Sequence, residues 1–186
     1  KNDLDLSGNL ILLDIYALPG YYSEDRYFNG LWDKLNEEEK SYTYFVPTLT
    51  QTSIFDYYKA YKALRGSERN ILIKEDLLHL SDIIYALLHF IRVMFLKFPS
   101  NTENGFDVSK LIKEEINSFN GLSSAIEGIL NYRFVRRLKE KNVHLKLVVD
   151  WWESQGLDKG LHLALNSYYP DVPVIGYLGY APRDLE

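Results

Sequence analysis

The run Asn9-Leu-Ile-Leu-Leu-Asp-Ile-Tyr16 decides the fold class of this chain. It is almost entirely apolar, and a turn with Pro19 and Gly20 follows it at once. A run without regular alternation of apolar and polar residues is typical of a β-strand that is covered on both faces. Four further runs of this kind occupy residues 41–46, 70–74, 145–151 and 172–178.

Helical patterns separate these runs. Apolar residues at helical spacing predict helices over residues 25–40, 53–65, 76–97, 107–141 and 155–168, with a break at Asn120-Gly121 in the fourth. Strands that alternate with helices indicate right-handed crossovers and a parallel sheet. We therefore predict one α/β domain over residues 1–186. Its fold would be a Rossmann-like three-layer sandwich with a mostly parallel five-stranded sheet, and an extra helical pair between strands three and four.

The segment 76–97 is apolar nearly all round, which favours a buried helix. No apolar run is long enough to predict a transmembrane helix. The chain starts at Lys1 without Met and ends at Glu186, and we expect it to be part of a longer protein.

Composition removes several classes of function. The net charge of −5 argues against a nucleic-acid partner, because such partners are held by clustered positive charge. There is no Cys, so a disulfide framework, a thiolate metal site and a Cys nucleophile are excluded. The four His are scattered without metal-ligand spacing, so no metal site is expected. Aromatic residues make up 15% of the chain, and the 15 Tyr suit either a sugar-binding surface or a half-buried core.

Ligands of a parallel sheet bind beyond the carboxyl ends of its strands. That rule places Tyr16, Thr50, Gln51, Glu75, Trp151, Trp152, Glu153, Tyr180 and Arg183 around one crevice. The chain has neither of the glycine patterns that cradle phosphates, GxGxxG and GxxxxGK[ST]. It also lacks the GxSxG elbow of serine hydrolases. A dinucleotide site and a serine hydrolase are therefore not expected.

The densest cluster of polar and aromatic residues is Asp150-Trp-Trp-Glu-Ser-Gln-Gly-Leu-Asp-Lys-Gly-Leu161. A carboxylate beside two indole rings is partly desolvated, which suits Glu153 to the role of general base. In the competing interpretation the cluster is structural: Ser154 caps the next helix, the tryptophans pack, and Asp158 and Lys159 are solvated. Both interpretations of Glu153 stay open at this point, and Asp76 beside Glu75 fits a helix cap as well as a site.

A family resemblance bears on the same segment. The run Trp152-Glu-Ser-Gln-Gly-Leu-Asp-Lys-Gly-Leu161, followed by Tyr168-Tyr-Pro-Asp-Val-Pro-Val-Ile-Gly-Tyr177, resembles bacterial surface-carbohydrate and capsule biosynthesis glycosyltransferases of the two-domain GT-B type. The resemblance covers roughly residues 143–183, under a quarter of the chain. Elsewhere only the order of strands and helices agrees.

The resemblance implies a function. The chain would be the N-terminal, acceptor-side half of a cytoplasmic glycosyltransferase that transfers a sugar to a glycan or lipid-linked acceptor. Glu153 would be the general base, and Trp152, Gln155, Tyr180, Arg183 and Glu75 would contact substrate. The nucleotide-sugar donor would lie on the C-terminal domain of the same chain, so no cofactor or catalytic metal is expected here. The isolated half would be inactive, and the full-length protein could associate peripherally with a membrane.

Two other functions remain open from the sequence. A receiver-like regulatory domain would gather acidic residues at strand ends, as Asp14, Glu75 and Asp76 suggest, although Asp14 lies inside the first predicted strand. A sugar-binding lobe would use the same crevice without performing chemistry.

Overall fold

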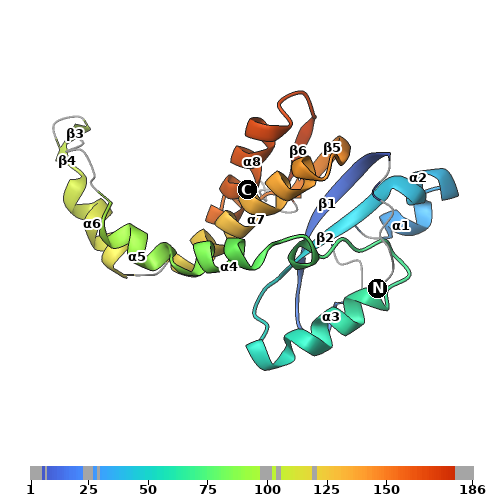
Figure 1. Cartoon of the computed structure of the whole chain (residues 1–186), viewed down its shortest axis with the longest axis horizontal. Helices are drawn as coiled ribbons and strands as arrows, with labels where there is room; N and C mark the ends of the chain where they lie inside the picture. The colour runs from blue at the N-terminus through green and yellow to red at the C-terminus, as the bar shows by residue number, and fades with distance from the viewer. Residues whose placement is uncertain are drawn as a thin grey trace, which may run out of the picture.

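The computed structural model describes residues 6, 8–22, 27–28, 30–96, 102–103, 106–118 and 121–178. Its main sheet has four strands: β1 (Asn9–Ala17), β2 (Thr43–Leu49), β5 (His144–Trp151) and β6 (Val174–Tyr177). They are all parallel and lie in the order β2-β1-β5-β6. The predicted α/β class with a parallel sheet is confirmed (Figure 1).

The predicted fifth strand, residues 70–74, is not a strand of this sheet. The Phe45 N–H donates to the Asn70 carbonyl at 2.9 Å, and the Leu72 N–H donates to the Phe45 carbonyl at 2.8 Å. These two bonds form one isolated parallel bridge, between Phe45 and Ile71. The chain then turns away in a 3₁₀ helix, η2 (Lys74–Asp76), so the ladder cannot continue. The segment still lies beyond β2, in an order that is compatible with a Rossmann-like sheet.

Pro47 lies inside β2, although the sequence pattern ended the strand before it. Its backbone is in register with Ile15 of β1. The bridge on the outer side of β2 involves only Phe45, so no described outer neighbour needs an N–H from residue 47. A proline is tolerated in a strand under that condition.

Helices cover both faces of the sheet. On one face, α7 (Leu122–Glu140) and α8 (Gly156–Tyr168) bury Phe134, Val135, Leu161 and Leu165 against Leu12 and its neighbours. On the other face, α1 (Leu31–Lys34) and α3 (Tyr57–Arg65) pack on a smaller apolar layer. The helix predicted over residues 25–40 is split, because Asn36 and Glu39 form a capping box that starts α2 (Glu37–Tyr42). A 3₁₀ turn, η1 (Ile54–Asp56), precedes α3.

Glycines let α7 and α8 touch through their backbones. A Cβ atom on Gly160 would lie 2.0 Å from the Gly128 carbonyl oxygen, and one on Gly128 would lie 2.5 Å from the Gly156 carbonyl oxygen. No side chain fits between the helices at these points. The crossing therefore fixes the first turn of α8, and with it the loop that leaves β5.

The segment 76–97 forms two short helices instead of one buried helix. They are α4 (Leu80–Leu87) and α5 (His89–Met94), and with β3 (Thr102–Glu103), β4 (Phe106–Asp107) and α6 (Ser109–Ser118) they make an arm that projects from the sheet (Figure 1). The expected burial is wrong, because Leu80 is 72% exposed and Met94 is 60% exposed. Within the described residues, no helix is long and apolar enough to cross a membrane.

Candidate functional site

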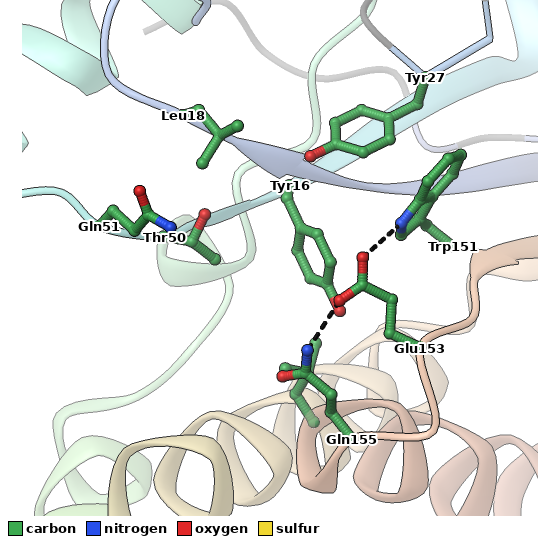
Figure 2. A pocket seen from close by; sticks show the side chains of 9 residues that line it. Tyr16, Leu18, Tyr27, Thr50, Gln51, Trp151, Glu153 and Gln155 are labelled. Atoms are coloured by element: carbon green, nitrogen blue, oxygen red, sulfur yellow. Dashed lines mark hydrogen bonds between the residues drawn. The ribbon is translucent and has the colours of Figure 1, made fainter. Parts of the chain in front are cut away.

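A pocket of about 520 Å³ lies at the carboxyl edge of the sheet. The chain passes from β1 to β2 on one side and returns to β5 on the other, so the loops after β1 and β5 diverge and leave a crevice. The described lining comes from the ends of β1, β2 and β5, from Tyr27 between β1 and α1, and from the start of α8 (Figure 2): Tyr16, Leu18, Tyr27, Thr50, Gln51, Trp151, Glu153, Gln155 and Leu157.

Three aromatic rings form one wall of the pocket. The Tyr27 and Trp151 ring centroids are 4.4 Å apart at an interplanar angle of 68°, and those of Tyr16 and Tyr27 are 6.1 Å apart at 82°. Edge-to-face packing of this kind holds rings in fixed positions. The wall is therefore rigid and mostly enclosed by the protein, because Tyr16 is only 8% exposed and Trp151 only 7% exposed.

The Glu153 carboxylate is held at the mouth of the pocket by two donors (Figure 2). The Trp151 indole Nε1–H donates to Oε1 at 2.9 Å, and the Gln155 amide donates to Oε2 at 2.7 Å. An ionised carboxylate has about four acceptor positions, so two remain for a ligand hydroxyl. The two donors fix the position of the Glu153 carboxylate and leave some of its acceptor positions open, which is the geometry that a general base needs.

Backbone strain lies beside the pocket. Ser154, between Glu153 and Gln155, has φ of 60°, and Gln51, in the loop after β2, has φ of 53°. Both are non-glycine residues in the left-handed region, which costs free energy and is common at functional sites. Two of the loops that line the pocket are therefore held in shapes that their own sequences do not favour.

The Asp158 side chain caps the N-terminus of α8. Its Oδ2 accepts from the Glu153 N–H at 3.0 Å and from the Gln155 N–H at 2.8 Å, and its Oδ1 accepts from the Tyr16 hydroxyl at 3.4 Å. The expectation that Asp158 is solvated is wrong, because the residue is fully buried. Burial is the main cause of its raised pKa, although the two N–H donors oppose that shift.

A buried polar layer lies under the pocket, between the sheet and α7. The Lys74 ammonium donates to Thr48 Oγ1 at 3.1 Å, to Glu127 Oε2 at 2.9 Å and to Asn131 Oδ1 at 2.9 Å. These contacts use its three protons, and Glu127 supplies the opposite charge. Glu127 and its ion pair with Lys74 tie α7 to the segment that follows the sheet edge.

Asp14 of β1 and Asp150 of β5 lie together in this layer, and both are buried. Asp14 Oδ2 and Asp150 Oδ1 have no donor among the described residues. Burial raises the pKa of Asp14 well above its usual range, and the negative charge of Asp150 adds to the effect. A hydrogen bond to the Asp150 side chain also contributes to the raised pKa of Asp14, so a proton kept on Asp14 would serve both carboxylates. His162 Nε2 lies 2.7 Å from the other Asp150 oxygen.

The structure brings two of the predicted site residues, Glu153 and Gln155, together in the pocket. Trp152 does not line it, because its ring packs edge-on against His162 with centroids 4.7 Å apart. Glu75 is also elsewhere, in hydrogen-bond contact with Tyr61 of α3. Tyr180 and Arg183 lie outside the described residues.

Sequence reasoning missed part of the site. Tyr27 comes from a loop far from any predicted strand end, and no local pattern marks it. Asp14 and Asp150 carried a usable signal, because each is a charged residue within an otherwise apolar strand. A buried carboxylate in such a position requires a partner.

In the described part of the chain, no group of three or more His, Cys, Asp or Glu residues is arranged to hold a metal ion. Comparison with known proteins found no matching family model, no matching curated protein and no matching solved structure. Fold and site together define an α/β domain that has a preformed pocket, walled by aromatic rings, at the crevice of a parallel sheet.

Proposed function

We propose that this chain is the Rossmann-like acceptor-binding domain of a glycosyltransferase for surface polysaccharide, and that Glu153 is its general base. One observation carries the proposal. A carboxylate oriented by an indole N–H and an amide stands at the mouth of a pocket walled by aromatic rings. Ring faces pack on the C–H surfaces of sugars, and a fixed carboxylate binds hydroxyl groups.

The chemistry assigned to Glu153 is one proton transfer. As the acceptor hydroxyl oxygen forms a bond to the anomeric carbon of the donor sugar, the bond from that carbon to the nucleoside diphosphate breaks. The hydroxyl proton passes to Glu153, and the leaving diphosphate keeps the electron pair of the broken bond. General-base assistance of this kind contributes roughly 10²–10⁴-fold to a rate.

The pocket fits the acceptor better than the donor. A nucleotide-sugar carries a diphosphate, which the Glu153 carboxylate would repel. Helix N-termini commonly bind phosphate, but Asp158 already accepts the N–H groups of Glu153 and Gln155 at the start of α8. We therefore place the donor on a second domain, as in enzymes of the GT-B type, and a glycan or lipid-linked glycan in this pocket.

The test is the substitution Glu153→Gln in the full-length protein, which keeps the shape of the side chain and removes the base. We expect transfer to a glycan acceptor to fall by about 10²-fold or more, with unchanged circular dichroism and unchanged donor affinity. Glu38→Gln, at an exposed position of α2, is the matched control and should keep full activity. Normal turnover in the Glu153→Gln variant would remove Glu153 from this role.

A sugar-binding lobe without catalysis is the second candidate, and the aromatic wall favours it equally. Binding and turnover measured on the wild-type protein separate the two functions. If wild-type protein binds oligosaccharides in calorimetry but transfers no sugar from any nucleotide-sugar donor, the binding function is the correct one.

A further inference from the structure

The arm presents an apolar face to solvent. Ten large apolar side chains between Leu80 and Leu96 are exposed, and Phe95 reaches 77%. The opposite face of the same helices, which packs against α7, contains the buried Asp82 and Ala86. The helices are therefore amphipathic, but their charged residue Asp82 faces the protein and their apolar side chains face water. Isolated monomers rarely expose an apolar surface of this extent, so it indicates an interaction site.

Five of the ten exposed residues follow the heptad spacing of a helix–helix seam. Separations of four, three, four and three residues connect Leu80, Ile84, Leu87, Ile91 and Met94. The Leu88 N–H donates to the Ile84 carbonyl at the end of α4, and the Arg92 N–H donates to the Leu88 carbonyl in α5. Leu80, Ile84 and Leu87 therefore share one face of α4, and Ile91 and Met94 share one face of α5. β-Branched residues at the a positions and Leu or Met at the d positions are the pattern that favours pairing of two helices.

We propose that this face, formed by α4 and α5, is the interface with a second copy of this chain. The proposal concerns the arm alone and is independent of what the pocket binds. In the dimer, α4–α5 of one copy packs on α4–α5 of the other about a two-fold axis, so the same residues meet from both sides. Burial of the seam removes the exposed apolar surface from water.

The exposed area approaches that of a dimer interface. Three of the ten side chains are aromatic and offer roughly 150–250 Å² each when fully exposed, the other seven are smaller, and all ten are on average about half exposed, so together they present on the order of several hundred Å². A standard interface buries about 800 Å² on each partner. The arm therefore supplies a large part of such an interface.

Charge favours a second copy over a lipid membrane. Membrane-surface helices set clustered Lys and Arg beside their apolar face, which anionic lipids attract. From Leu80 to Leu96 the acidic and basic residues are Asp82, His89 and Arg92, and the whole chain carries −5. Asp82 is buried in an ion pair with Arg137, and the Arg92 guanidinium lies over the Tyr85 ring at 3.7 Å. An almost uncharged face can meet its own copy without repulsion.

Sedimentation velocity of the full protein over a wide range of micromolar concentrations tests the proposal. We expect the mass of two chains for wild type and of one chain for the double variant Ile84→Glu with Leu87→Glu. Leu163→Glu is the matched control, because Leu163 is an exposed leucine of α8 that lies outside the arm, and it should leave the dimer intact. A wild-type protein that stays monomeric overturns the proposal. If that monomer also binds phosphatidylglycerol vesicles through Ile84 and Leu87, the face belongs to a membrane.

Cross-linking gives a second test, which needs no loss of folding. The chain has no Cys, so one introduced cysteine reports one position. We expect Leu87→Cys, at the centre of the seam, to form a disulfide-linked dimer on mild oxidation, and Leu163→Cys not to do so. If the two variants cross-link to the same small extent, the seam is not an interface. A mixture of Leu80→Cys and Met94→Cys chains that cross-links to each other identifies an antiparallel pair.

Discussion

Asp14 is the residue of the buried polar layer that links the stability of the fold to pH. Its pKa is raised in the folded protein, so the folded state keeps a proton that the unfolded chain releases near pH 4. The contribution of Asp14 to the free energy of unfolding is complete at pH values below its pKa in the unfolded chain. That contribution is lost as the pH rises through its pKa in the folded protein. Stability should therefore fall with pH across that window, by at most about 1.4 kcal/mol per pH unit. Asp158, whose pKa is also raised, adds to the trend.

Asp14→Asn isolates this contribution. An amide in place of the protonated carboxyl donates permanently to Asp150, so we expect the free energy of unfolding to rise at pH 8 and to depend less on pH. Urea denaturation between pH 4 and pH 8 measures both changes. Asp171→Asn, at an exposed position, should leave the pH profile unchanged. A variant that keeps the full wild-type pH dependence would show that Asp14 is not the titrating group.

Among the elements, the crossing of α7 and α8 matters most, because no side chain separates the two backbones at Gly128 and Gly160. We expect Gly160→Ala to destabilise the protein by about 3 kcal/mol, since the new methyl group meets a carbonyl oxygen that cannot move alone. Gly121→Ala is the control: nothing lies within 4 Å of its added Cβ, so we expect a cost below about 1 kcal/mol. Chemical denaturation compares the two, and equal losses would contradict backbone contact at the crossing.

The elements also show how far the sequence could lead. The four strands and the end of α8 followed from apolar runs and from turn residues, because burial on both faces leaves a continuous apolar pattern. Residues 70–74 have the composition of a strand, but composition does not reveal that the chain turns into η2 after a single bridge. The prediction that residues 76–97 form one buried helix was wrong for a related reason. An apolar helix face has the same sequence pattern whether its own domain or a partner covers it. Glu153 and Gln155 were found because both follow a strand end, whereas Tyr27 arrives through a loop.

For the whole molecule, the arm is joined to the sheet domain through a buried ion pair. Arg137 of α7 donates to Asp82 of α4 through Nε at 2.8 Å and through Nη2 at 2.9 Å. Hydrogen bonds from Arg137 and from the His79 N–H lower the pKa of Asp82 despite its burial. Its charge therefore helps to stabilise the fold above about pH 4, and that help is lost as the pH falls through the lowered pKa.

Arg137→Leu should cost about 3 kcal/mol, because it leaves the buried Asp82 charge with the His79 N–H at 3.0 Å and with Arg133 only at 3.9 Å. Arg136→Leu, which removes an exposed pair with Glu140, should cost less than about 1 kcal/mol. Thermal unfolding measures both costs, and hydrogen exchange on α4 shows whether the arm has detached. If exchange on α4 is unchanged in Arg137→Leu, the ion pair does not hold the arm.

Asp158 has a further consequence for how the molecule meets its solvent. Helix α8 carries its own counter-ion, supplied by its own first turn and held by two backbone N–H groups. The N–H groups of Glu153 and Gln155, just before α8, are therefore already paired and do not serve a dissolved anion such as phosphate or sulfate. A ligand of the pocket beside it would meet the aromatic rings, the Thr50 hydroxyl and the Glu153 carboxylate in place of these two backbone donors.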